Sequence, residues 1–181
     1  MEEISKSIVE QYEDYYENIA PFESAIRDME HLAWEQRLSE EEISDFLASN
    51  LGVPAAEIFY IRAILHKACG HHHDAIRLAR MAIEGHPLPL RSALLLSELY
   101  YSVGEYQYAI IYADIVEEME RVRGEIAFVD QARSIKVMAF YKLHDLKSAI
   151  LILANCASSV QFHADGEYFS YEAMKALLQK R

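Results

Sequence analysis

The sequence predicts an all-α protein built from pairs of antiparallel helices that stack side by side. Apolar residues recur at spacings of three and four along nearly the whole chain, which is the period of an amphipathic helix. One residue pattern also recurs 34 residues further on, which is the length of a repeated helix-turn-helix unit. Glycine and proline fall between the expected helices, where they end one helix and allow a turn into the next.

Length and composition suit a globular chain: 181 residues, of which 52% are hydrophobic and 25% charged. No apolar run approaches the roughly 20 residues of a membrane helix, and residues 1–20 are acidic where a signal peptide would be basic and then apolar. We therefore expect a soluble, cytoplasmic protein. Cys69 and Cys156 lack the spacing of a metal site or a disulfide framework, so both are expected in the core.

The formal charge of −12 is concentrated at the beginning of the chain. Residues 1–46 hold 14 Asp or Glu against Lys6, Arg27 and Arg37, which gives 3 − 14 = −11. This excess repels a phosphate backbone, so nucleic-acid binding is not expected. The acidic segment either recruits a basic partner or is a solvated helix face that keeps the protein in solution.

Residues 1–52 are predicted to form an acidic N-terminal helical segment. Pro21 separates two apolar stripes, and Ser39 with Glu42 reads as the capping box of a further short helix. The first stripe contains Ile4, Ile8, Tyr12, Tyr15 and Ile19, and the second contains Phe22, Ile26, Met29 and Ala33, with Trp34 beside it.

Two repeats are expected over residues 56–89 and 90–123, each with a glycine turn between its helices. Small residues such as Ala63 and Ala75 stand where the two helices of a hairpin approach most closely. The matched positions are Phe59, Ala63, Gly70, Ala75, Ala82 and Pro87, which recur as Ala93, Ser97, Gly104, Ala109, Val116 and Arg121.

A third repeat is expected over about 124–163, offset by 40 residues rather than 34, so the added residues should lengthen the second hairpin. Its turn, at His144, lacks glycine. Residues 164–181 follow as a C-terminal cap, with a final amphipathic helix predicted over 167–180 that closes the apolar end of the stack.

Residues Gly104-Glu105-Tyr106-Gln107-Tyr108-Ala109-Ile110 resemble the turn and the start of the second helix in the tetratricopeptide repeat family. The chain departs from that family at Phe59 and Ala93, where Trp is preferred, at Ala63 and Ser97, where Gly is preferred, and at Arg121, where Pro is preferred. The resemblance implies a right-handed superhelix of helical hairpins whose first helices line a concave groove.

Family positions that line this groove, carried over to the present sequence, are expected to bind a partner. They give Tyr60, Ile64, Lys67, Arg91, Leu94, Glu98, Tyr101, Met138 and Tyr141, together with Glu57, Ala68, Ser102, Gln131, Ser134 and Lys142. The lining is aromatic and apolar, which favours a helix or an extended peptide as ligand. Tyr60 and Ile64 stand where family members that bind a chaperone's terminal carboxylate carry Lys and Asn. The chain's own N-terminal helix could instead cover some of these side chains.

Three functions remain open at the level of sequence. The first is a protein-binding adaptor or chaperone-like module, similar in size and charge to bacterial type III secretion chaperones. The second is a structural subunit that assembles through its N-terminal helices, for example as a homodimer. The third and least favoured is a metal-dependent enzyme at His66 and His71–His73, because adjacent residues in a turn cannot all point at one ion and no catalytic motif is found. We therefore expect no enzymatic activity, no cofactor and no native metal.

Overall fold

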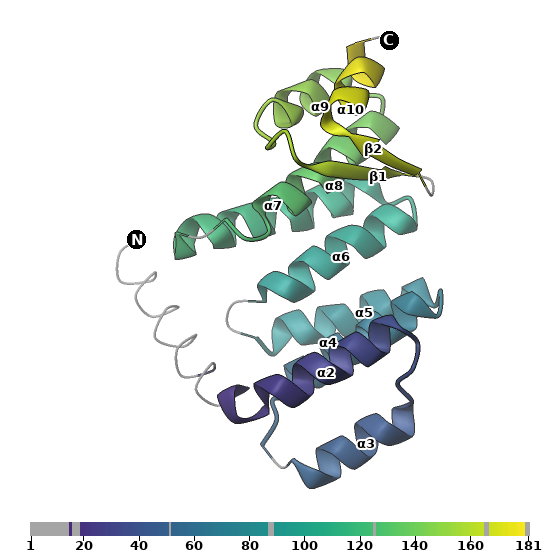
Figure 1. Ribbon diagram of the computed structural model, residues 1–181, viewed down its shortest axis with the longest axis vertical. Coiled ribbons are helices and arrows are strands. Elements are labelled where there is room, and N and C mark those ends of the chain that lie inside the picture. The colour runs from purple at the N-terminus through teal and green to yellow at the C-terminus, as the bar shows by residue number, and fades with distance from the viewer. Residues whose placement is uncertain are drawn as a thin grey trace. The chain divides into compact units, whose positions relative to one another are not determined.

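The computed structural model describes residue 15 and residues 19–50, 52–86, 89–124, 126–164 and 167–179. The chain divides into two compact units, Met1–Leu95 and Leu96–Arg181, and the division falls inside helix α6 (Leu90–Ser102). The described residues are mostly helical, which confirms the predicted all-α class apart from one short β-hairpin (Figure 1). Each unit is described by itself below.

The first unit contains four helices besides the beginning of α6 among its described residues. A 3₁₀ turn, η1 (Ala20–Phe22), holds Pro21 and leads into α2 (Glu23–Trp34); α3 (Glu40–Ser49), α4 (Ala55–Ala68) and α5 (His72–Glu84) follow. The predicted capping box opens α3, since Ser39 Oγ accepts the Glu42 amide at 3.2 Å and Glu42 Oε2 accepts the Ser39 amide at 2.8 Å. The expected stripe from Ile4 to Tyr12 lies outside the described residues.

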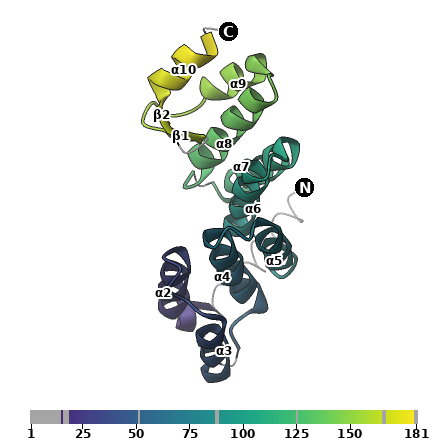
Figure 2. The same ribbon diagram turned by 90° about the vertical axis from the view of Figure 1, so that its right-hand side faces the viewer.

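Helix α2 packs along α4, and both views show the two helices side by side (Figures 1 and 2). Ile26, Met29 and Ala33 of the predicted second stripe are buried, so that stripe is the core-facing side of α2. Ala63 and Ala75 are fully buried in the α4–α5 hairpin, as the close approach of these two helices requires.

The second unit contains the rest of α6 and the helices α7 (Tyr106–Arg123), α8 (Val129–Lys142), α9 (Leu146–Leu153) and α10 (Tyr171–Gln179). In the α6–α7 hairpin, the Ser97 hydroxyl donates to the Ala109 carbonyl at 2.8 Å. The small residue at 97 thus also gives its buried hydroxyl a hydrogen-bond partner on the neighbouring helix. Helix α7 has 18 residues against 13 in α5, which confirms that the added residues lengthen the second hairpin.

The C-terminal region departs from the prediction of a helix over 167–180. Strands β1 (Gln161–Ala164) and β2 (Glu167–Ser170) pair antiparallel, with Phe162 opposite Phe169, and the helix begins only at Tyr171. Because side chains alternate along a strand, Phe162 reaches the core while Tyr168 remains exposed. Asp165-Gly166 between two runs with aromatic residues is a hairpin signal in the sequence that was interpreted only as a break.

Four helices, α2, α4, α6 and α8, end in the same turn. A residue with positive φ follows each helix: Gln36 (56°), Gly70 (77°), Gly104 (83°) and His144 (60°). The amide after this residue bonds to the carbonyl five residues back, as in His71 to His66 at 2.8 Å, which is the Schellman pattern. The spacings are 70 − 36 = 34, 104 − 70 = 34 and 144 − 104 = 40. The turn at Gln36 was not predicted, because no glycine marks it.

Candidate interaction surfaces

In the first unit, three of the predicted groove residues contact the chain's own N-terminal helix α2, through its Glu30 and Trp34 side chains. Tyr60, Ile64 and Leu94 are buried, whereas Lys67 and Arg91 are half-buried. The Tyr60 hydroxyl donates to Glu30 Oε1 of α2 at 3.2 Å, and Arg91 pairs with the same carboxylate. Helix α2 therefore covers this part of the predicted lining, which is the alternative that the sequence left open.

Two cations of the first unit lie over aromatic rings. The Arg91 guanidinium lies 4.5 Å from the centroid of Tyr60, and Lys67 Nζ lies 4.7 Å from the ring of Trp34 in α2. The side chains of Arg91 and Lys67 thus contribute to holding α2 in place, and their charges are already engaged within the unit.

A buried polar cluster lies beside these contacts. Tyr15 donates its hydroxyl to Glu57 Oε1 at 3.0 Å, and His86 Nε2 lies 3.7 Å from the same oxygen. Burial raises the pKa of Glu57, lowers the pKa of His86 to about 4 and raises the pKa of Tyr15. The Tyr15 and His86 rings are 4.2 Å apart and Glu57 is only 5% exposed, so the cluster holds Tyr15 against α4.

In the second unit, helices α6 and α8 present the remaining predicted residues. Glu98, Tyr101 and Tyr141 are half-buried, and Gln131 Nε2 donates to Glu98 Oε1 at 2.7 Å, which joins the two helices. We call the set Glu98, Tyr101, Gln131, Ser134 and Tyr141 the α6–α8 face.

Met138, which was predicted to bind a partner, belongs instead to the core. It is 2% exposed and lies in a cluster with Phe162 of β1 and Met174 of α10. The prediction rests on the groove-lining positions of the tetratricopeptide repeat family, carried over to this helix. Strand β1 packs on α8 and covers this position.

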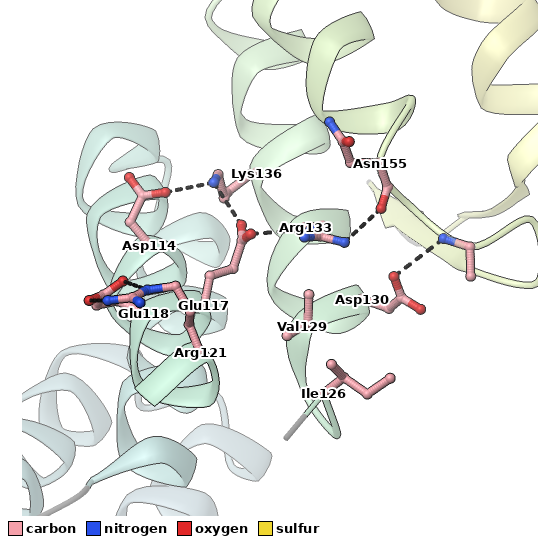
Figure 3. A pocket seen from close by; sticks show the side chains of 11 residues that line it. Asp114, Glu117, Glu118, Arg121, Ile126, Val129, Asp130, Arg133, Lys136 and Asn155 are labelled. Atoms are coloured by element: carbon pink, nitrogen blue, oxygen red, sulfur yellow. Dashed lines mark hydrogen bonds and ion pairs between the residues drawn. The ribbon is translucent and has the colours of Figure 1, made fainter. Parts of the chain in front are cut away.

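A cleft of about 630 Å³ opens between α7, α8 and the segment after α9 (Figure 3). Seven of its eleven lining residues carry charged side chains, and Ile126, Val129 and Ala157 add apolar surface. We call it the α7–α8 cleft; it is lined by Asp114, Glu117, Glu118, Arg121, Ile126, Val129, Asp130, Arg133, Lys136, Asn155 and Ala157.

Ion pairs join the two helices across this cleft. Lys136 Nζ donates to Asp114 Oδ1 at 2.6 Å and to Glu117 Oε1 at 2.7 Å, and Arg133 Nε donates to Glu117 Oε2 at 3.2 Å (Figure 3). Burial alone would lower the pKa of Lys136, but the hydrogen bonds to Asp114 and Glu117 outweigh it and raise the pKa. Lys136 is therefore charged at neutral pH although its side chain is only 10% exposed.

Two further bonds tie the segment after α9 to α8. Arg133 donates to the Asn155 carbonyl at 2.6 Å, and Asp130 Oδ1 accepts the Ala157 amide at 3.3 Å. This network is not among the sites that the sequence predicts. The sequence carries a signal for it. The acids at 114 and 117 are three residues apart, as are the cations at 133 and 136, so each pair lies on one face of its helix and the two pairs have opposite charge.

The histidines of the α4–α5 turn do not form a metal centre with neighbouring groups. His66 and His71 have ring centroids 5.7 Å apart, and His86 belongs to the Glu57 cluster. Over the part of the chain that the structure describes, no three His, Cys, Asp or Glu residues are arranged to hold a metal ion.

No helix among the described residues combines the length and apolar character needed to cross a membrane. Comparisons with protein-family models, with curated proteins and with solved structures give no match to this chain. The function is therefore argued from the geometry of its surfaces.

Proposed function

We propose that this protein is a protein-binding module that holds a helix or an extended segment of a partner on the α6–α8 face. The observation that carries the proposal is the pairing of α6 and α8 through Gln131 and Glu98, with the half-buried rings of Tyr101 and Tyr141 on the same helices. The resemblance to tetratricopeptide repeats supports the same interpretation, because the first helices of those hairpins bind partners.

The chemistry of the face suits recognition of a peptide. A tyrosine offers a large apolar ring at low conformational cost, so tyrosines are frequent anchors in interfaces. The Tyr101 hydroxyl oxygen is buried, so its ring is the part that a partner would contact. The ring of Tyr101 packs against the ring of Tyr106, with the two centroids 5.5 Å apart, and against the core of the second unit. A side chain that is fixed before binding loses little further freedom when a partner arrives.

Coverage by α2 narrows the set of residues proposed for binding. Tyr60, Ile64, Lys67, Arg91 and Leu94 are buried or engaged inside the first unit, and Met138 is in the core. The proposed contacts are therefore Glu98, Tyr101 and Tyr141 of the predicted set, with Gln131 and Ser134 beside them.

A matched pair of substitutions tests the proposal. Gln131→Arg places a long cation on the face at an exposed position, whereas Gln107→Arg makes the same change at an exposed position of α7. In affinity capture from native cell extract, we expect Gln131→Arg and Tyr101→Ala to reduce recovery of the captured partner about tenfold, an effect of the size of one interface anchor. Gln107→Arg should capture as the wild type does.

Circular dichroism and urea unfolding of each variant separate binding from folding. Because Tyr101 also packs against the core, the folded Gln131→Arg variant is the decisive one. Equal capture by wild type and folded Gln131→Arg would show that the α6–α8 face is not the binding surface.

A further inference from the structure

We propose that the α7–α8 cleft is a second docking site, which takes a basic segment of a partner protein that carries an apolar residue next to its Lys or Arg. This site is separate from the α6–α8 face, and the inference does not depend on that face binding anything. It rests on the shape of the cleft, on its charges and on its exposed apolar side chains.

The walls of the cleft are fixed before a ligand arrives. Glu117 accepts bonds from both Arg133 and Lys136, which links α7 to α8, and Arg133 and Asp130 anchor the segment after α9 (Figure 3). Three chain segments are thus tied together around one open volume. A preformed site of this kind loses little conformational entropy on binding.

The charges of the cleft favour a cationic ligand. Its three cations already bond to carboxylates, Lys136 and Arg133 to Glu117 and Arg121 to Glu118. Among the described residues, Asp114 bonds to Lys136 through one oxygen and keeps a side chain 56% exposed. Asp130 likewise uses one oxygen, for the Ala157 amide.

The second oxygens of Asp114 and Asp130 are therefore the strongest acceptors left for a ligand. A Lys or Arg side chain can donate to a carboxylate oxygen of this kind. Residues 96–181, which form the second unit, hold 12 Asp or Glu against 9 Lys or Arg, and this formal charge of 9 − 12 = −3 also favours a basic ligand.

Apolar side chains at the cleft complete the recognition pattern. Ile126 is 82% exposed, and Val129, three residues further along the chain, is half-buried and also lines the cleft. A ligand side chain that covers Ile126 would remove apolar surface from water and shield the neighbouring ion pairs. An apolar residue beside the cation thus distinguishes a peptide segment from a simple ion.

A metal ion fits the cleft less well than a peptide. A divalent cation needs several converging oxygens, and no such group is found among the described residues. A phosphate or another anion would meet cations that are already neutralised by Glu117 and Glu118.

Fluorescence anisotropy with three capped, labelled hexapeptides tests the inference. GLKRLG carries both the cations and the apolar residues, GLEELG reverses the charge, and GAKRAG removes the apolar side chains. We expect GLKRLG to bind the full-length protein at sub-millimolar concentration, GAKRAG to bind about fivefold more weakly, and GLEELG to show no binding. Raised NaCl should weaken the complex.

Two variants with the same change in net charge locate the site. Asp114→Asn combined with Asp130→Asn removes the two proposed acceptor charges, whereas Glu105→Gln combined with Glu172→Gln removes two exposed acids outside the cleft. We expect the first pair to weaken GLKRLG binding about tenfold and the second to change it less than twofold, since only the first pair removes close charge contacts. Ile126→Ser should weaken binding about threefold.

Several results would overturn the inference. These are equal binding to the two charge-matched variants, equal binding of GLEELG, no binding of GLKRLG at millimolar protein, or displacement by CaCl₂ beyond that caused by NaCl of the same ionic strength. Gln131→Ala alters the α6–α8 face at an exposed position outside the core cluster and changes no charge, so it should leave GLKRLG binding unchanged. If folded Gln131→Ala abolishes that binding, the peptide sits on the α6–α8 face and the cleft is not its site.

Discussion

Glu57 and His86 differ from most other acids and histidines of the chain because both are largely buried in the fold. In the sequence, Glu57 is one of many acids near the beginning of the chain, and His86 is one of several histidines near the α4–α5 hairpin. In the structure both are largely removed from water, and Glu57 Oε1 accepts the Tyr15 hydroxyl while lying 3.7 Å from His86 Nε2. Burial penalises the charged form of each, so protonation of this cluster is coupled to folding.

The stability of the protein should therefore fall as the pH falls, through the contribution of His86. The folded-state pKa of about 4 lies below the unfolded-state value of about 6.5, so the unfolded chain takes up the proton first. The contribution of His86 to the free energy of unfolding is fully present above pH 6.5. It is lost as the pH falls from about 6.5 to about 4, and the loss is at most about 3 kcal/mol. Glu57 acts in the opposite direction, because its raised pKa favours the folded state as the pH falls.

Comparison with His86→Gln isolates the histidine from the glutamate. Urea unfolding at about pH 7.5, 6 and 4.5 should show that wild type loses stability relative to His86→Gln as the pH falls through this window. If the free energies of unfolding of wild type and His86→Gln differ by the same amount at all three pH values, the buried, neutral state of His86 is contradicted.

Tyr60 and Met138 mark the limit of residue-level prediction. Both occupy groove-lining positions by their spacing, yet each is covered by another element of the fold, Tyr60 by α2 and Met138 by β1. Helical periodicity identifies which side of a helix is apolar. It does not reveal which neighbouring element packs on that side.

At the scale of the element, the turns after α2, α4, α6 and α8 share one geometry but not one residue type. Glycine adopts a positive φ without steric penalty, whereas Gln36 and His144 carry a Cβ that crowds the following carbonyl. Gly70 and Gly104 could be recognised from the sequence as helix ends for this reason. Gln36 could not, because the tertiary contacts of its side chain hold it in that conformation.

His144→Gly should stabilise the protein by about 0.5 kcal/mol, since relief of the left-handed strain exceeds the added flexibility of the unfolded chain. His144 is exposed at φ 60°, so its side chain loses few contacts. Thermal unfolding followed by circular dichroism measures the change.

Gln36→Gly is the matched comparison, with φ 56° at the same place in the turn. Gln36 Nε2 donates to the Ala68 carbonyl at the end of α4, at 2.5 Å, and glycine would lose this bond. We expect no gain in stability from Gln36→Gly. A gain there and none at His144 would show that the strain argument is wrong.

At the scale of the whole molecule, the second apolar stripe of the N-terminal segment packs inside the protein's own core. Ile26, Met29 and Ala33 are buried on α2, which packs against α4. These three residues are therefore not free to join copies of the protein. Assembly through the N-terminal helices remains a prediction for the first stripe, of which the structure describes Tyr15 and Ile19.

Met29→Ala distinguishes internal packing from self-association. Removal of a side chain that is 7% exposed should lower the free energy of unfolding by about 2 kcal/mol or more, through lost burial and the cavity left behind. Light scattering across a concentration series should give the same mass for Met29→Ala as for wild type. A lower mass for the variant, with its stability unchanged, would place Met29 in an interface between copies.

The sequence by itself determined the helices and most of their ends. Apolar spacing, the capping box at Ser39, and the glycines at 70 and 104 act within a few residues of one another, so short-range rules suffice. The third repeat begins 40 residues after the second rather than 34, and this offset could also be read from the sequence pattern. The added residues lengthen α7, which has 18 residues against 13 in α5.

Only the tertiary structure decided which surfaces remain open. Coverage of Tyr60 by α2, of Met138 by β1, and the formation of the α7–α8 cleft each depend on groups far apart along the chain, such as Lys136 and Asp114. Burial and charge pairing are properties of three-dimensional neighbours, and no local spacing specifies them.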